Sequence, residues 1–384
     1  MQRRTLLAGS CAGLLATMTA TRLAFAQAPT QNRFVFVFLR GALDGLHALV
    51  PYADADFRRL RPRLAQAPDS VLDLDGYFGL DAALAPLLPW FQAGELALLP
   101  AVATRYRERS HFDGQALLEN GTASPSGARD GWLNRAILAL NAGDRRLGLA
   151  LGPSVPLILQ GAAPVQSWSN EHLPDLDEGF LSRLGIVYRG DPAFDAAFRA
   201  AQGTPQPDLS GMAEGTDNFT FAARAAGDIL AHDAGPRIAV MQIDGWDTHV
   251  NQTGRLTNQF ARLSEGLLML RQSLGAAWGQ SVVLVASEFG RTVAENGAGG
   301  TDHGTGGLAM LAGGAVRGGR IVGDWPGLSD RALHEGRDLA APNAIEALFK
   351  AVLIGHMGLS PALADSVVFP GSAGIAPLEG LLRA

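Results

Sequence analysis

The segment 281–306, SVVLVASEFGRTVAENGAGGTDHGTG, combines an expected buried strand with a group of chemically active side chains. It opens on an apolar, largely β-branched run, which is typical of a strand covered on both faces of a parallel sheet. Glu288 and Arg291 follow this run, and a loop of Gly, Asn and Thr then leads to Asp302 and His303. Ligands of open α/β sheets bind beyond the carboxyl ends of the strands, so the segment predicts a metal or anion site there. For the Asp-His pair alone, hydrogen bonds to backbone groups are an equally good explanation.

Three other apolar runs predict further strands of the same sheet, at 33–39, 96–103 and 237–243. Each run is continuous rather than alternating, which indicates burial on both faces of the sheet. The last of them precedes an amphipathic stretch from about 256 to 275 that predicts a helix. The fold class expected from these strands and helices is α/β, with a mainly parallel sheet sandwiched by helices.

Polar side chains also follow two of these other strands. Asp44 comes just after the first strand, on a glycine-rich turn where an Asp before Gly is also an ordinary turn residue. Asp247 and His249 follow the strand at 237–243. Residues two apart on extended backbone point to the same side, so this pair can face one cation. Asp244 is an alternative to Asp247.

Ser110 lies at the start of an expected helix and has two interpretations. With Asp113 three residues later it resembles an N-cap with its acidic partner. It also lies beside Arg109 and under the positive end of the helix dipole, which suits an anion or a metal-activated hydroxyl. Both interpretations can hold together. The next residue, His111, is a secondary candidate ligand.

The first 26 residues predict a targeting segment. Arg3 and Arg4 form a twin-arginine pair, an apolar run continues to Ala20, and a small-x-small pattern ends at Ala26. We expect cleavage there, which leaves 27–384 as the mature protein in the periplasm or outside the cell. The apolar run is too short and too polar for a membrane span, so no span is expected after cleavage.

Composition narrows the chemistry further. Cys11 is the only cysteine of the 384 residues, so the mature protein has no disulfide and any metal must bind oxygen and imidazole. Cys11 lies inside the apolar run, but Ala8-Gly9-Ser10 lacks the large aliphatic residue of a lipoprotein signal. The net charge of -6 argues against nucleic acid as a partner. Residues 125–235 lose the strand and helix rhythm, which predicts an insertion or lid within a single domain.

Five motifs carry a family resemblance: RGALDGLH at 40–47, RSHFDGQ at 109–115, GWDTHVNQ at 245–252, SEFGRTVAENG at 287–297 and GTDHGTGG at 300–307. Together they resemble the bacterial family called domain of unknown function 1501, over nearly the whole mature chain. That family is typically exported by a twin-arginine signal and is grouped with the alkaline phosphatase and sulfatase superfamily. The resemblance implies an alkaline-phosphatase-like fold with a metal site at the strand ends.

The resemblance also implies roles for single residues. In the superfamily, acids, histidines and a Ser or Thr nucleophile bind two divalent metals, commonly zinc or manganese. The matching positions are Asp44 as the early acid, Ser110 as the nucleophile, Asp247 and His249 as the first metal pair, Glu288 as the later acid and His303 as the late histidine. The superfamily usually has His after the later acid, whereas this chain has Phe289, so we expect one or two ions.

The function implied is metal-dependent hydrolysis of a phosphate or sulfate ester, carried by a small molecule or a polymer. Ser110 or a metal-bound water would be the nucleophile, and Arg291 or Arg109 would stabilise charge growing on the ester oxygens. The alternative is a catalytically degenerate binding or scaffold protein of the same fold, which Phe289 favours.

Overall fold

The computed structural model describes residues 30–140, 147–170, 178–192, 194–195, 198–199, 207–213 and 215–383. The expected targeting segment, 1–26, lies outside these residues. Within the described part of the chain, no helix is both long and apolar enough to cross a membrane.

A nine-stranded mixed sheet forms the centre of the molecule, in the order β11-β5-β10-β9-β1-β8-β6-β7 with β14 beside β5. The strands are β1 (Arg33–Arg40), β5 (Leu96–Ala103), β6 (Gly148–Leu151), β7 (Gln166–Trp168), β8 (Ile238–Asp244), β9 (Ser281–Ser287), β10 (Gly307–Ala312), β11 (Arg320–Ile321) and β14 (Asn343–Ala344). β1 pairs in parallel with β8 and β9, whereas β10 is antiparallel to both β5 and β9. The four strands expected from apolar runs are thereby confirmed.

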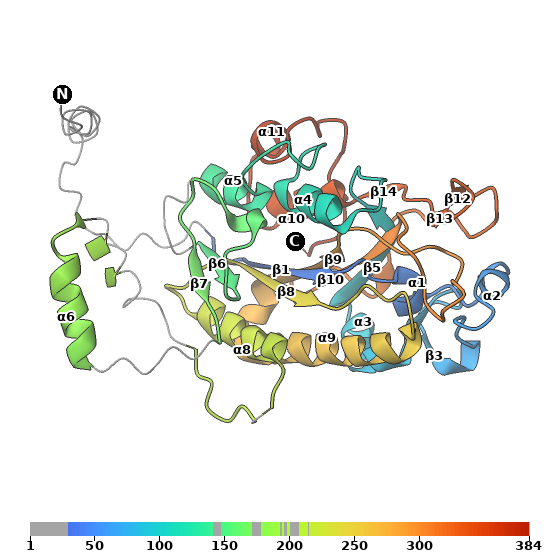
Figure 1. Cartoon of the computed structure of the whole chain (residues 1–384), viewed down its shortest axis with the longest axis horizontal. Helices are drawn as coiled ribbons and strands as arrows, with labels where there is room; N and C mark the ends of the chain where they lie inside the picture. The colour runs from blue at the N-terminus through green and yellow to red at the C-terminus, as the bar shows by residue number, and fades with distance from the viewer. Residues whose placement is uncertain are drawn as a thin grey trace.

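Two helical layers cover the sheet, as Figure 1 shows. One layer contains α3 (Leu88–Gln92), α8 (Asn218–Ala231) and α9 (Gln252–Leu274), and the other contains α4 (His111–Asn120), α5 (Trp132–Ala139) and α10 (Ile345–Gly355). Alternate residues of β1 divide between them, with Val35 and Val37 in the core under α8 and α9 and with Phe34 and Phe36 in the core under α5 and α10. A strand between two apolar layers has no polar face, which explains the continuous apolar runs. The expected sheet sandwiched by helices is confirmed.

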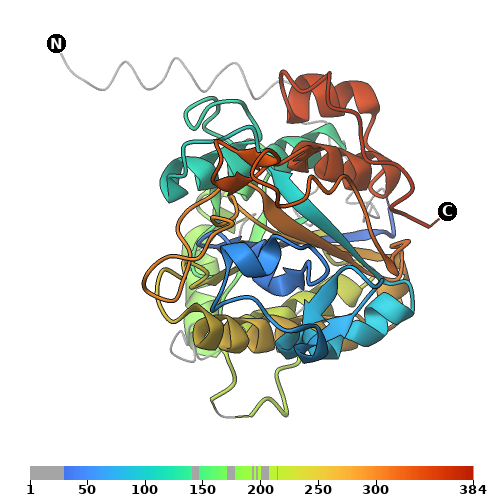
Figure 2. The same ribbon diagram turned by 90° about the vertical axis from the view of Figure 1, so that its right-hand side faces the viewer.

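Further α-helices and β-strands lie outside the main sheet and its two helical layers. They are α1 (Gly45–Ala48), α2 (Phe57–Leu60), α6 (Glu178–Tyr188), α11 (Pro361–Leu363), β2 (Leu49–Val50), β3 (Val71–Asp73), β4 (Gly79–Asp81), β12 (Leu333–His334) and β13 (Asp338–Leu339). β2, β4 and β3 form a small separate sheet near α1, visible at the front of Figure 2.

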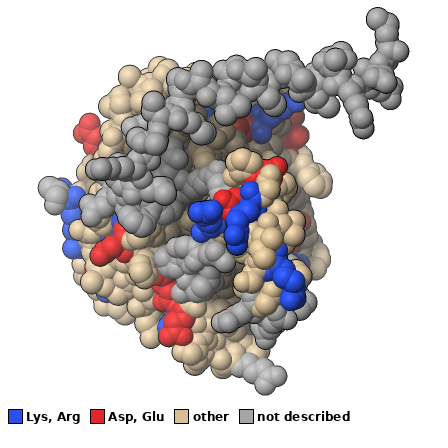
Figure 3. Space-filling view, turned by 90° about the vertical axis from the view of Figure 1, so that its left-hand side faces the viewer, with Lys and Arg blue, Asp and Glu red and all other residues tan. Residues whose placement is uncertain are grey.

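The segment 125–235, expected as an insertion or lid, contributes to both the sheet and its covering layers. β6 pairs in parallel with β8, and α8 packs on α9. Among the described parts of this segment, α6 stands apart from the sheet in Figure 1. Figure 3 views that end of the molecule, where arginine or lysine side chains lie beside acidic ones. A lid role for the segment stays a prediction.

The central parallel strands end at one edge of the sheet. In the strand register, Arg40 at the end of β1 lies opposite Asp244 of β8, and Leu39 lies opposite Ser287 of β9. The loops after β1, β8 and β9 therefore leave the sheet side by side. This edge is where the candidate residues of these loops are brought close together.

Candidate metal centre

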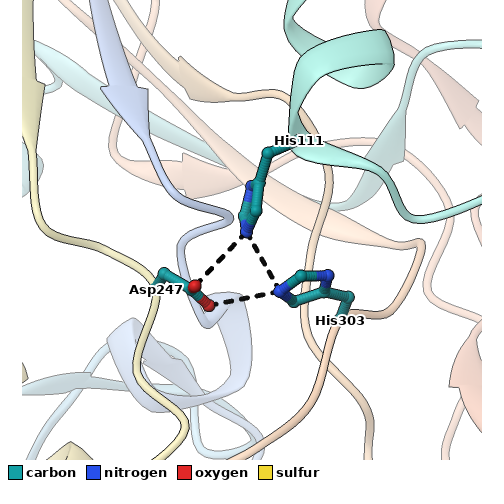
Figure 4. Close-up of side chains that lie close together, drawn as sticks. All are labelled: His111, Asp247 and His303. Carbon is teal, nitrogen blue, oxygen red and sulfur yellow. Dashed lines mark hydrogen bonds and ion pairs between the residues drawn. The ribbon is translucent and has the colours of Figure 1, made fainter.

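Three histidines and one aspartate converge beyond this edge of the sheet. The Nε2 atom of His303 lies 3.0 Å from Nε2 of His111 and 3.0 Å from Nε2 of His249. Asp247 Oδ1 lies 2.9 Å from His249 Nε2 and 3.3 Å from His303 Nε2. Figure 4 shows His111, Asp247 and His303 pointing at one another. Within the described chain, the ligand atoms of these three side chains form one group in which all lie within 4.8 Å of one another.

The local structure explains how the four side chains reach this point. His111 is the first residue of α4, so its ring projects from the helix start beside the sheet edge. Asp247 and His249 lie on the loop between β8 and α9. His303 lies on the loop before β10, where it forms an isolated bridge with Arg291 on the loop after β9. One helix start and two separate loops thus supply the donors.

Each imidazole has its second nitrogen, Nδ1, next to an oxygen that can only accept a hydrogen bond. These oxygens are Glu288 Oε1 at 2.7 Å from His111, Asp302 Oδ1 at 3.0 Å from His249 and the Arg109 carbonyl at 2.9 Å from His303. Nδ1 therefore carries the proton in each ring, and Nε2 of a neutral ring presents a lone pair. Three such lone pairs and a carboxylate repel one another unless a cation or added protons lie between them.

Glu288 holds His111 from the buried side. It is fully buried, and it accepts hydrogen bonds from Gly41 N at 3.0 Å and from Gln115 Nε2 at 3.0 Å besides that of His111. Burial raises the pKa of Glu288, but the hydrogen bonds from His111 and Gln115 outweigh it and lower the pKa overall. Phe289 stacks on the His111 ring with centroids 5.0 Å apart. Phe289, which stands where the resemblance led us to expect a histidine, therefore packs against His111 of the centre.

Arg291 fixes Asp247. Its buried guanidinium donates to Asp247 Oδ1 at 2.5 Å and to Thr301 Oγ1 at 3.2 Å. Burial raises the pKa of Asp247, but hydrogen bonds from His111, His303 and Arg291 hold it far below its usual value. Asp247, followed by Glu288, raises the pKa of His111 to about 9. In the absence of a cation, Asp247 is thus ionised and His111 carries an added proton at neutral pH.

Asp44 lies outside this centre. Its carboxylate caps α1 through Leu46 N at 3.1 Å and forms an ion pair with Arg61 at 2.8 Å, and both side chains are buried. Burial raises the pKa of Asp44, but Arg61, His47 and Gln252 together outweigh burial and leave the pKa below its usual value. Gln252 donates to the same carboxylate. The carboxylate of Asp44, which was expected to bind metal, is therefore fully occupied by hydrogen-bond donors of the protein.

The remaining candidates lie around the centre rather than in it. Ser110 caps α4, with its Oγ accepting from Asp113 N at 3.5 Å. The Arg109 side chain donates to Asp338 at 2.7 Å and to Glu335 at 2.5 Å, so only its carbonyl faces the centre. Asp244 is exposed at the end of β8.

Two residues at the centre were only secondary candidates from the sequence, and a third residue, outside the centre, was not a candidate at all. His111 and Asp302 were secondary candidates, yet the first supplies a converging nitrogen and the second holds His249. Arg61, the partner of Asp44, had no signal in the sequence, because its position in an exposed-looking Arg-rich stretch gives no hint of full burial. For His111 the usable signal is its place directly after a helix N-cap next to the sheet edge.

A family model described as protein of unknown function (DUF1501) matches residues 100–363, which include His111, Asp247, His249 and His303. The chain belongs to this DUF1501 family. No curated protein matches the DUF1501 chain.

Three solved structures similar to this DUF1501 protein have 11% to 13% identity and TM-scores of 0.35 to 0.43. Ps i-CgsB has 11% identity over 86% of this chain and 73% of its own, with a TM-score of 0.43. The phosphonate monoester hydrolase of Agrobacterium radiobacter has 13% identity over 91% and 78%, with a TM-score of 0.43. Alkaline phosphatase from the Antarctic bacterium TAB5 has 11% identity over 74% and 91%, with a TM-score of 0.35. Likeness at this level does not transfer an activity.

Proposed function

We propose that this protein is an exported, metal-dependent hydrolase of phosphate or sulfate esters. The observation that supports the proposal most strongly is the convergence of His111, His249 and His303 through Nε2 while each Nδ1 is held by an acceptor. Histidines that bind metals are held in this way by carboxylates or backbone carbonyls, which orient the ring and raise its basicity. Export through the targeting segment 1–26 is part of the proposal.

The donor set fits one divalent cation of the zinc or manganese class. Three imidazole nitrogens and one carboxylate oxygen from Asp247 match the ligands that zinc prefers, and manganese also accepts them. Asp44 and Glu288, the acids expected at a second ion, already bind Arg61 and His111. We therefore propose a single ion. When bound, a divalent cation supplies Lewis acidity and lowers the pKa of a water molecule.

The side chains around the centre then have two tasks. Arg291 keeps Asp247 ionised, and Glu288 keeps the proton of His111 on Nδ1 so that Nε2 can bind the cation. The centre is open to solvent, since the side chains of Asp247 and His249 are each 41% exposed. We assign the nucleophile to water rather than to Ser110, whose Oγ is engaged at the start of α4.

The test is a measurement of metal content and ester hydrolysis on the purified full chain. We expect one equivalent of zinc or manganese after incubation with either metal, and hydrolysis of p-nitrophenyl phosphate or p-nitrophenyl sulfate. His303→Ala should lose both, because His303 contacts every other donor of the centre. His232→Ala, at an exposed histidine at the end of α8, should keep both. A metal-free wild-type protein after this incubation would refute the proposal.

One observation favours the non-catalytic alternative. Arg291 and Arg109, the guanidinium groups expected to bind the ester oxygens, are both engaged by acidic side chains. A binding or scaffold protein needs no free cation for a transition state. Stoichiometric metal without hydrolysis of any phosphate or sulfate ester would support this second function.

A further inference from the structure

A cavity of about 580 Å³ lies at the carboxyl ends of β1, β8 and β6, closed on one side by the start of α8. Its polar lining residues are Arg40, Ser154, Asn218, Gln242, Asp244 and Arg262. None of these residues belongs to the metal centre. A volume of this size lies in the range of pockets that hold small organic ligands.

The cavity adjoins the metal centre through the backbone. Trp246 N donates to the carbonyl of the lining residue Arg40 at 3.3 Å. Gly41, the next residue, lies so close to the loop that an added Cβ would be 2.6 Å from Asp247 N. Gly41 also has a φ of +118°, which side chains disfavour, so glycine is needed for this approach. The cavity and the metal centre therefore lie on either side of one backbone contact, between the end of β1 and the loop after β8.

The charges of the cavity do not favour an anion. Arg40 donates to Glu119, and Arg262 donates to Asp217 at 2.8 Å, so an acid neutralises each guanidinium. Asp244 is the charged lining residue that is not neutralised, because its carboxylate has no partner within the described residues. An exposed carboxylate accepts hydrogen bonds and repels a phosphate or sulfate group.

The rest of the lining offers neutral hydrogen-bonding groups beside apolar surface. The Ser154 hydroxyl and the Asn218 amide are exposed and have no hydrogen-bond partner in the described chain. Leu151 and Ala222 supply apolar wall. A group with several hydroxyls on a ring and C–H surface between them matches this combination.

We propose that this cavity binds a neutral saccharide unit that adjoins the ester group of the substrate. The place of the ester at the metal centre rests on the proposed function, whereas saccharide binding by the cavity does not. Asp244 accepts hydrogen bonds from two ring hydroxyls, and Asn218 and Ser154 contact others.

The experiment uses the full chain on a glycan array that carries neutral, acidic and amino oligosaccharides, followed by calorimetry with the best neutral glycan. Wild-type protein should bind at least one neutral glycan. Asp244→Ala should weaken its Kd at least tenfold, since a hydrogen bond to a charged group is lost. Asp69→Ala, at another exposed aspartate without a side-chain partner in the described part, should leave the Kd unchanged.

Several outcomes would overturn the proposal: no neutral glycan bound, binding of acidic or amino glycans alone, or an unchanged Kd in Asp244→Ala. Asn218→Ala gives a second check, with an expected loss of several-fold. His303→Ala separates the two hypotheses, because it should lose metal and still bind the glycan. A wild-type protein that binds the glycan but no metal would refute the proposed hydrolase and leave the saccharide cavity supported.

Discussion

Asp44 and Asp247 occupy similar places in the chain and have opposite surroundings. Both follow a strand of the parallel pair β1 and β8, and both were expected to bind metal. The side chain of Asp44 is 1% exposed and paired with Arg61, whereas that of Asp247 is 41% exposed and faces three imidazoles. Gln252 lies beside the first acid and accepts hydrogen bonds from Thr248 and Thr301 next to the second.

The difference shows that the partner, not the acid, decides the chemistry of a strand-end carboxylate. A guanidinium has only donors and a permanent charge, so the pair of Asp44 and Arg61 is complete. Asp247 also binds a guanidinium, that of Arg291, but its two oxygens face three imidazoles as well. The lone pairs of neutral imidazoles need a cation or added protons between them. The first pair is structural, and the second group has the composition of a binding site.

The largest expected effect is on stability, at the Asp44 pair. Arg61→Met leaves a buried carboxylate without its cation, which should reduce the free energy of unfolding by about 3–5 kcal/mol. Arg63→Met is the matched control, because Arg63 is 57% exposed beside Glu295 and its loss should cost about 0–1 kcal/mol. Urea denaturation of both variants measures this. Equal stability of the two variants would mean that the comparison between Asp44 and Asp247 is wrong.

The next effect is on metal binding, at the other acid. Asp247→Asn keeps the size of the side chain and a hydrogen bond to Arg291 but removes the ligand charge. Zinc affinity should fall about 100-fold or more. Loss of a residue that only holds a metal ligand costs up to about 100-fold, and loss of a ligand itself should cost at least as much. The free energy of unfolding without metal should change by only about 1 kcal/mol. Chelator competition gives the affinity, and Asp44→Asn should reverse the pattern, with a large loss of stability.

A smaller loss is expected from the groups that orient the histidines. Glu288→Gln should weaken metal binding about tenfold, because the amide holds Nδ1 of His111 less firmly than a buried carboxylate. Asp302 holds His249 in the same way but is 52% exposed, so Asp302→Asn should have the weaker effect. Calorimetric titration with zinc compares the two. A stronger effect of Asp302→Asn would contradict this ranking by burial.

The smallest effect is a pH dependence of the metal-free protein. The pKa of His111 is raised from 6.5 to about 9, so the added proton stabilises the folded state fully below pH 6.5. That contribution is lost as the pH rises through 9. The Tm in EDTA should therefore fall between pH 6.5 and 9, and His111→Gln should remove this part of the slope. The pKa of Asp44 is lowered, so its pair contributes nothing to the slope in this range.

The link between the added proton of His111 and metal binding can be tested in the wild-type protein. A cation must displace the added proton of His111, so zinc affinity should rise as the pH increases toward 9. Titration calorimetry in buffers of different ionisation enthalpy measures the proton released. A flat affinity between pH 6.5 and 9 would show that His111 is not a ligand.

Much of the fold was predictable because apolar runs carry their own signal. The continuous runs at β1, β5, β8 and β9 indicated strands buried on both faces, and the structure places them as neighbours in one sheet or one strand apart. The strand pattern is unclear in 125–235, since β6 and β7 are short and β6 joins the sheet through β8, which is distant in sequence. Short strands depend on tertiary pairing more than on local pattern.

The sequence by itself determined the strands, the polar loops at their carboxyl ends and the supply of carboxylates and imidazoles without any thiol. Backbone periodicity and residue type suffice for these. Only the tertiary structure decided that Asp44 meets Arg61 while Asp247 and His249 meet His111 and His303, because these partners come from other segments of the chain. The local sequence does not specify which side chain from another segment will contact each acid. That contact makes Asp44 part of a buried ion pair and Asp247 part of a candidate metal centre.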